Sequence, residues 1–226
     1  MDREIAGYPA ELVRLELEAA DADHASRTLE IWTVADLDRF VDAEALLRAV
    51  DPPDPPYWAL PWIGARAIAA RLLSAPPAAT TRVLEIGCGL GLAGVAAGLG
   101  GASVLFTDYV AEARAFARAT AEHQRLRSFD TRIVDFTRDR LDARYDLVIA
   151  ADVVYEPQSY EPLVDFLAMH TAPRGRVLLT ESLRADAKRV LAMLVERGFS
   201  LATEAAWVPE DGKLERTWLH ELGRRE

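Results

Sequence analysis

The segment from Val83 to Gly94, which reads VLEIGCGLGLAG, constrains the fold of this chain more than any other stretch. It begins as an apolar run, interrupted only by Glu85, that predicts a buried strand. Gly87, Gly89 and Gly91 follow within a few residues. Glycines in such a turn let the backbone approach a ligand, and the free N–H groups of a following helix can bind it. The segment therefore predicts the nucleotide-binding edge of an open α/β sheet.

Strands and helices alternate along the rest of the chain. Short apolar runs predict strands, and apolar residues at helical spacing predict helices. The expected strands are 82–86, 103–107, 131–134, 145–150, 176–180, 200–207 and 216–222. The expected helices are one from Pro61 to before Pro76, then 92–99, 111–123, 162–169, and one from Ala187 that Gly198 ends. This order predicts a Rossmann-like, doubly wound α/β fold, whose mostly parallel seven-stranded sheet has an antiparallel terminal strand.

A proline-rich stretch divides the chain. Residues 52–56 read PPDPP, which is a stiff spacer that cannot be helical. Before it, residues 12–17 and 28–32 alternate like two paired strands, and residues 42–50 read as a short helix. We therefore expect an N-terminal extension and linker at 1–56 and a Rossmann-like domain at 57–226.

Composition excludes several classes of protein. The chain has 226 residues, half of them hydrophobic, so it can bury a core without disulfide or metal staples. A single cysteine excludes a disulfide scaffold and a thiolate-rich zinc site, and the four histidines lack metal-ligand spacing. A net charge of −10 argues against a free-standing nucleic-acid binder.

The same features indicate a cytoplasmic protein. The N-terminus lacks the apolar run of a secretory signal. The uncharged stretch 86–107 contains seven glycines, which is unlike a membrane-spanning helix. We expect no membrane partner and no metal, and the oligomeric state is left open.

Two acids bear on the identity of the ligand. Gly89-x-Gly91-x-x-Gly94 also fits the dinucleotide fingerprint, so the glycines alone leave an NAD-dependent oxidoreductase open. Glu85, inside the strand, suits a ligand with a cationic group, or it braces the loop. Asp108 ends the second strand, where an acid can accept hydrogen bonds from two ribose hydroxyls. The alternative role for Asp108 is to cap the helix at 111–123.

These residues carry a resemblance to a known family. Glu85, the three loop glycines and Asp108 resemble the cofactor region of class I S-adenosylmethionine-dependent methyltransferases. Asp152-Val-Val-Tyr155 after the fourth strand, and Tyr57–Trp62 before the first, resemble the seven-β-strand protein lysine methyltransferases with an Asp-x-x-Tyr motif. The likeness is greatest to the electron-transfer-flavoprotein β-subunit lysine methyltransferases and their bacterial relatives. It extends over about residues 57–199.

The resemblance implies a set of contacts to S-adenosylmethionine. The methionine part would lie against Glu85, Gly87, Cys88, Gly89 and Gly91, and the ribose would meet Asp108. The adenine would lie near Tyr109 and the pair Asp135-Phe136, with Trp62 covering the cofactor and Ala151 lining it. The residues themselves leave two alternatives open, namely that Trp62 is a core aromatic and that Cys88 is a small packing residue.

The resemblance also gives Asp152 and Tyr155 the chemical roles. Methyl transfer from a sulfonium needs an uncharged nucleophile in line with the methyl group, so an amine must lose its proton. Asp152 would orient that amine, and Tyr155 would offer a hydroxyl and a ring face to a cationic nitrogen. The alternatives are a capping or loop-bracing role for Asp152 and ordinary packing for Tyr155.

The function expected is therefore S-adenosylmethionine-dependent N-methylation of a lysine side chain in a protein. Three alternatives stay open. They are a methyltransferase of a small-molecule amine, an NAD-dependent oxidoreductase, and a cofactor-binding scaffold whose catalytic pair is idle.

Overall fold

The computed structural model describes residues 3–17, 27–40, 56–181, 187–210 and 213–225. These residues form one seven-stranded sheet and one three-stranded sheet. The strands of the large sheet are β4 (Arg82–Ile86), β5 (Ser103–Asp108), β6 (Phe129–Ile133), β7 (Tyr145–Ala151), β8 (Thr171–Glu181), β9 (Phe199–Glu210) and β10 (Lys213–Arg224). The predicted helix at 42–50 and most of the proline spacer lie outside the described residues.

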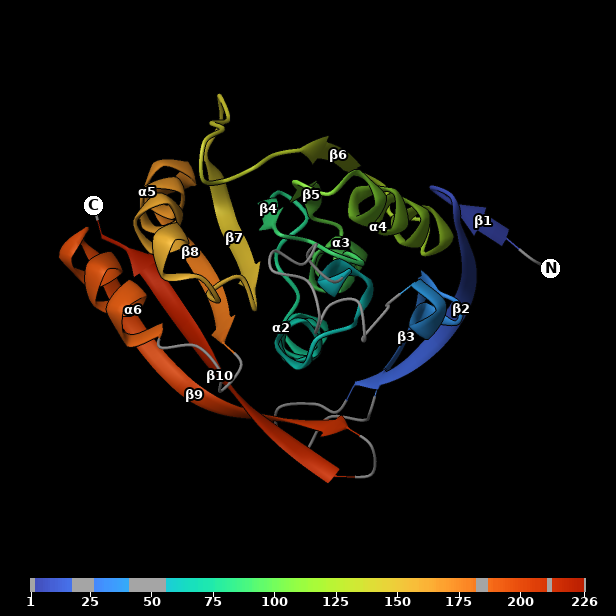
Figure 1. Ribbon diagram of the computed structural model, residues 1–226. Coiled ribbons are helices and arrows are strands. Elements are labelled where there is room, and N and C mark those ends of the chain that lie inside the picture. Colours follow the sequence, from blue (N-terminus) through green and yellow to red (C-terminus); the bar gives the residue numbers. More distant parts are fainter. Residues whose placement is uncertain (1–2, 18–26, 41–55, 182–186, 211–212, 226) are drawn as a thin grey trace, which may run out of the picture.

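The order of strands in the large sheet is β6-β5-β4-β7-β8-β10-β9 (Figure 1). The pairs from β6 to β8 are parallel, and β10 is antiparallel to both of its neighbours. The predicted Rossmann-like sheet with an antiparallel terminal strand is confirmed. The order reverses between β4 and β7, and open α/β sheets bind ligands at such a switch point.

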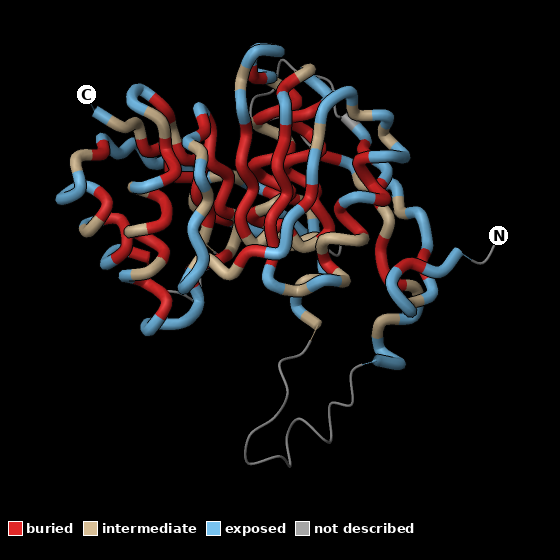
Figure 2. The backbone as a smooth tube through the Cα atoms, turned by 90° about the horizontal axis from the view of Figure 1, so that it is seen from above, coloured by how far each residue is buried: buried red, intermediate tan, exposed pale blue. Residues whose placement is uncertain are grey.

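Helices cover both faces of this sheet (Figure 1). Helices α2 (Ile63–Ser74), α3 (Leu92–Leu99) and α4 (Ala111–His123) pack on one face, and α5 (Tyr160–His170) and α6 (Ala187–Glu196) on the other. Side chains alternate between the faces along each strand. Val83 therefore belongs to the first core and Leu84 to the second. The central strands are buried almost throughout (Figure 2).

Helix α2 begins later than the sequence predicts. We expected Pro61 as its first residue, but the helix starts at Ile63, and Trp62 occupies the N-cap position. The N–H of Trp62 donates to the carbonyl of Leu60 at 3.0 Å, which closes a tight turn around Pro61. Pro61 therefore lies in a turn that precedes the helix and is not part of the helix itself. The end of α2, at Ser74, precedes Pro76 as expected.

The N-terminal strands form an antiparallel sheet that packs beside α4 (Figure 1). It consists of β1 (Arg3–Ile5), β2 (Tyr8–Leu17) and β3 (Arg27–Val34), so the two predicted strands pair and a third joins them. The backbone N–H of Trp32 donates to the Thr120 hydroxyl at 3.1 Å. Buried residues of this sheet belong to the same core as α2, α3 and α4. A domain boundary at 56/57 stays a prediction.

The remaining described elements are three short 3-10 turns, namely η1 (Leu37–Phe40), η2 (Tyr57–Ala59) and η3 (Pro157–Ser159). None of the helices in the described ranges combines the length and apolar character needed to span a membrane.

Candidate active site

The glycine loop after β4 lies between two other segments of the chain. Gly87 and Gly89 have positive φ angles of 57° and 50°, a conformation that favours glycine. A Cβ on Gly87 would lie 2.7 Å from Cγ1 of Val153, and a Cβ on Gly89 would lie 2.9 Å from the carbonyl oxygen of Trp58. The loop therefore has no room for side chains, because the Asp-x-x-Tyr segment and η2 press against it.

Two buried carboxyl groups brace this loop. Oε2 of Glu85 accepts a hydrogen bond from the N–H of Gly94 at 3.1 Å. Oδ2 of Asp108 accepts from Gly89 at 3.0 Å, and its Oδ1 accepts from Val110 at 2.9 Å. The bracing role that we weighed for Glu85 is thus present. The N-cap of α4 is Val110, so Asp108 binds the loop and the turn rather than capping that helix.

Burial raises the pKa of both carboxyl groups. Loss of solvent raises the pKa of Glu85 to about 8, and the nearby charge of Asp108 adds to the shift. Burial likewise raises the pKa of Asp108 above its ordinary value, although N–H donors at Val110 and Gly89 oppose the shift. At neutral pH, burial therefore favours the protonated form of Glu85, and a positive charge beside this group would favour the ionised form.

Cys88 is buried within the loop. Its backbone N–H donates to the Thr107 carbonyl at 3.0 Å, and burial raises the pKa of its thiol well above the usual value. A thiol held neutral is a poor nucleophile, so Cys88 does not act as one, and its contact with the cofactor stays a prediction.

The segment before α2 lies over the glycine loop. The indole N–H of Trp62 donates to the Tyr57 carbonyl at 2.7 Å, and the two rings lie 6.2 Å apart. Trp62 is half-buried and belongs to neither core cluster. Trp58 is the aromatic of this segment that packs inward, against Tyr8 and Phe116 at 5.6 and 5.4 Å between ring centroids.

Asp152 directly follows Ala151, the last residue of β7, and has an unusual backbone conformation. Its φ angle is +53°, in the left-handed region that residues other than glycine rarely enter and that, among these, aspartate and asparagine enter most readily. Its Oδ2 accepts a hydrogen bond from the N–H of Gly64, in the first turn of α2, at 2.9 Å. The capping alternative is therefore present in the fold, although the capped helix is 88 residues away in sequence.

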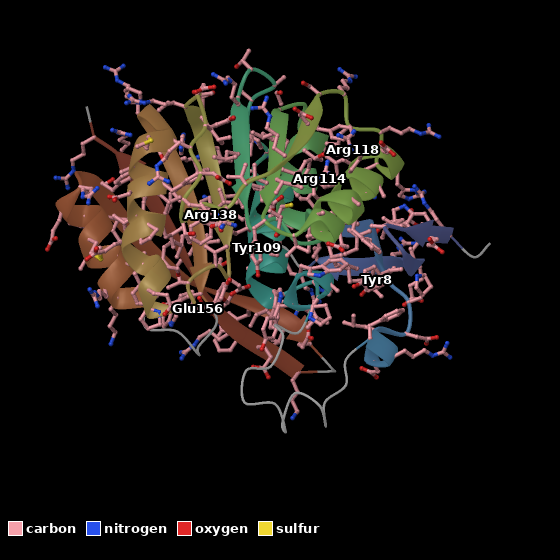
Figure 3. The ribbon with its side chains drawn as sticks, turned by 45° about the horizontal axis from the view of Figure 1, so that its top comes forward. Tyr8, Tyr109, Arg114, Arg118, Arg138 and Glu156 are labelled. Carbon is pink, nitrogen blue, oxygen red and sulfur yellow. The ribbon has the colours of Figure 1, made fainter. Side chains whose placement is uncertain are left out.

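The rest of the Asp-x-x-Tyr motif is divided between core and surface. Val153 and Val154 are 5% and 3% exposed, whereas Tyr155 is 56% exposed. The two valines fix the segment against the core, and this presents Tyr155 at the surface near the end of β7. Figure 3 shows the neighbouring Glu156 on the same side of the molecule as Tyr109 and Arg138.

The pair after β6, Asp135-Phe136, is held by contacts within its loop and with α5. Oδ1 of Asp135 accepts hydrogen bonds from the N–H and hydroxyl of Thr137, at 2.9 and 2.6 Å, and Arg138 lies 2.9 Å from Oδ2. Burial would raise the pKa of Asp135, but these partners outweigh it and hold the pKa below its usual value. Phe136 packs against Phe166 of α5, 6.4 Å between centroids. The Asp135 carboxylate thus orders its own loop, and Tyr109 is half-exposed.

Sequence reasoning missed Gly64, Thr180 and Trp58 as parts of this site. Gly64 and Thr180 contact Asp152, but both are distant from it in sequence and carry no motif of their own. Trp58 lies within Tyr57–Trp62, which carried part of the resemblance, so this aromatic stretch could have indicated a role for it.

Comparison with known proteins identifies the family. The sequence pattern of the lysine methyltransferases matches residues 62–197. The electron transfer flavoprotein β subunit lysine methyltransferase of Xenopus laevis is 33% identical over 138 residues, which is 58% of this chain and 54% of the relative. That of Danio rerio is 29% identical over 172 residues, which is 69% of this chain and 66% of the relative. The chain thus matches about half to two thirds of the length of these curated relatives.

Solved structures share the fold. N-methyltransferase NodS from Bradyrhizobium japonicum, in complex with S-adenosylhomocysteine, superposes with a TM-score of 0.59 at 19% identity and covers 84% of this chain and 97% of that one. The YcgJ protein of Bacillus subtilis superposes with a TM-score of 0.59 at 13% identity, covering 71% and 98%.

The family pattern covers more than half of the chain, and the fold is that of S-adenosylmethionine-dependent methyltransferases. The match to this family argues against the NAD-dependent alternative. The chain belongs to the lysine methyltransferase family.

Proposed function

We propose that the chain transfers a methyl group from S-adenosylmethionine to a lysine side chain of a protein, and that this protein is an electron transfer flavoprotein β subunit. The observation that supports this most is the position of Asp152. Its carboxylate is fixed by α2 at the end of β7, and the next residue, Val153, packs against Gly87 of the cofactor loop. An acid so placed can orient an amine beside the methyl donor. The named relatives support the choice of substrate.

The residues around the glycine loop fit S-adenosylmethionine, which supplies the methyl group. Gly87 and Gly89 bring no side chain to the loop, and the buried carboxyl groups of Glu85 and Asp108 hydrogen-bond its backbone. A carboxylate offers about four acceptor sites, so the bonds to Gly94 and Gly89 leave capacity for a ligand. The cofactor site would be completed by Cys88, Gly91, Tyr109, Asp135, Phe136, Ala151 and Trp62.

The reaction requires the chain to hold a neutral amine in line with the methyl group. A lysine amine loses its proton more readily where it is desolvated. Asp152 would accept a hydrogen bond from the amine and fix its direction. Tyr155 would place its ring and hydroxyl beside the nitrogen, whose positive charge grows as the new N–C bond forms.

The rival proposal is a small-molecule amine as acceptor. The exposure of Tyr155 favours an acceptor on a large partner, because a small amine would need a closed pocket. We also propose a cytoplasmic location, which the single, buried cysteine supports.

A labelling experiment separates these possibilities. S-adenosylmethionine with a labelled methyl group is incubated with the chain and either the flavoprotein β subunit or a set of small amines that includes free lysine. We expect label on the β subunit. Label on the small amines alone would overturn the protein substrate. Absence of label from both, with S-adenosylhomocysteine bound normally, would support the idle scaffold.

A further inference from the structure

Two residues hold Asp152 in place, and the family resemblance assigned no role to either of them. The first is Gly64, whose N–H holds Oδ2 of Asp152. The second is Thr180, at the end of β8, whose carbonyl accepts a hydrogen bond from the N–H of Asp152 at 3.2 Å. Asp152 is thus held through its backbone by β8 and through its side chain by α2.

Asp152 and Thr180 leave no room for a side chain at position 64. A Cβ on Gly64 would lie 2.3 Å from Oδ2 of Asp152 and 2.3 Å from Oγ1 of Thr180. Gly64 has an ordinary helical φ, so its backbone does not require glycine. The requirement comes from the close approach of two oxygens, and those oxygens belong to the acid and its neighbour.

The Thr180 hydroxyl is an unusual feature of this contact. Thr180 is fully buried, and its Oγ1 has no hydrogen-bond partner among the residues that the structure describes. A buried hydroxyl left without a hydrogen-bond partner destabilises the folded chain. Valine would fill the same space in a β-strand without that cost, so folding alone favours valine here.

Building on the proposed function, we propose that Gly64 and Thr180 are positioning residues for the methyl-accepting amine. Gly64 sets the direction of the Asp152 carboxylate through its N–H and its missing side chain. The Thr180 hydroxyl donates to that carboxylate when an amine engages it, so the acid keeps its orientation during transfer. Neither residue touches the reacting atoms.

The test of Thr180 uses two effects of opposite sign. Thr180→Val should raise the midpoint of denaturation, because it removes an unsatisfied hydroxyl, yet lower kcat about tenfold with little change in the dissociation constant of S-adenosylhomocysteine. Thr180→Ser keeps the hydroxyl and should retain most of the turnover. The matched control is Thr171→Val at the other end of β8. The Thr171 hydroxyl donates to the Leu167 carbonyl at 2.7 Å, so this change should lower stability and leave kcat unchanged.

Gly64→Ala gives the second test. It should lower kcat more than tenfold while S-adenosylhomocysteine still binds. Gly98→Ala in α3 is the control, since a Cβ there would meet the side chains of Leu126 and Val104, which are remote from Asp152 in the fold. A Thr180→Val protein that is stabilised and fully active, or a fully active Gly64→Ala protein, would overturn the positioning role. If the wild type methylates no amine at all, the proposed function itself is refuted.

Discussion

The carboxylate of Asp152 accepts a hydrogen bond from the backbone N–H of Gly64 at 2.9 Å, so the acid of the Asp-x-x-Tyr motif also caps helix α2. The first N–H groups of a helix have no partner within it, and the positive end of the helix dipole favours an anion there. One side chain therefore serves the fold and the proposed chemistry.

Two substitutions of Asp152 separate these roles. Asp152→Asn retains an oxygen that can accept from Gly64, so stability should stay within about 0.5 kcal/mol of the wild type. Asp152→Ala removes the cap and should cost about 1–2 kcal/mol. Both should lose methyl transfer by at least a hundredfold. Chemical denaturation and single-turnover rates measure the two effects, and an active Asp152→Asn protein would show that the charge is dispensable.

Glu85 should make stability depend on pH. Its pKa is about 8 in the folded chain against 4.5 for an ordinary glutamate, so between these values the folded state holds a proton that the unfolded state has lost. The contribution of this group is therefore complete below about pH 4.5 and is lost as the pH rises toward 8. Glu85→Gln removes this slope. Between pH 5 and pH 9, the denaturation midpoint of the variant should rise relative to that of the wild type as the pH increases. Parallel curves would contradict a raised pKa for Glu85.

Cofactor binding should release protons if Glu85 meets a cationic group. A positive charge beside a buried carboxyl stabilises its ionised form and lowers its pKa. Titration calorimetry of S-adenosylhomocysteine near pH 7, in buffers of different ionisation enthalpy, measures the protons released. We expect release from the wild type and less from Glu85→Gln. If both proteins release equal numbers of protons, Glu85 does not meet a cationic group and only holds the N–H of Gly94.

Tyr155 should affect turnover with little effect on folding. It is 56% exposed, so substitutions should change stability by no more than about 0.5 kcal/mol. Tyr155→Phe keeps the ring and loses the hydroxyl, whereas Tyr155→Ala loses both. Turnover should fall in that order, and wild-type turnover in Tyr155→Ala would remove Tyr155 from the site.

Trp58 should link the N-terminal sheet to cofactor binding. Its ring packs between Tyr8 and Phe116, and its carbonyl lies against Gly89. Trp58→Ala should cost about 2–4 kcal/mol and weaken S-adenosylhomocysteine binding. Trp207, which is 55% exposed on β9, is the control, since Trp207→Ala should change neither quantity. If Trp58→Ala binds S-adenosylhomocysteine with wild-type affinity, the packing of the N-terminal sheet and cofactor binding are independent.

The large sheet could be predicted because its signals are local. The apolar runs of β4, β5 and β7 and the helical stripe of α4 each lie within a short window of sequence. The insertion of β10 between β8 and β9 had no such signal, because pairing partners depend on tertiary packing. Strand β1 has three residues, which is too short for a pattern.

The site, like the sheet, could be predicted from the sequence only where its signals are local. The motif around Asp152 was visible in the sequence, but its contact with Gly64 joins residues 88 positions apart. The side-chain partners of Asp135 are close in sequence, yet which way its carboxylate turns depends on how the loop folds.

The most direct test of the account is the mass of the acceptor after reaction. The chain and its Asp152→Asn variant, at equal occupancy with S-adenosylmethionine, are each incubated with electron transfer flavoprotein β subunit, and tandem mass spectrometry locates added methyl groups. We predict methylation of a lysine Nζ by the wild type and none by the variant. An unmodified β subunit, or methyl groups only on other atoms, would contradict the account.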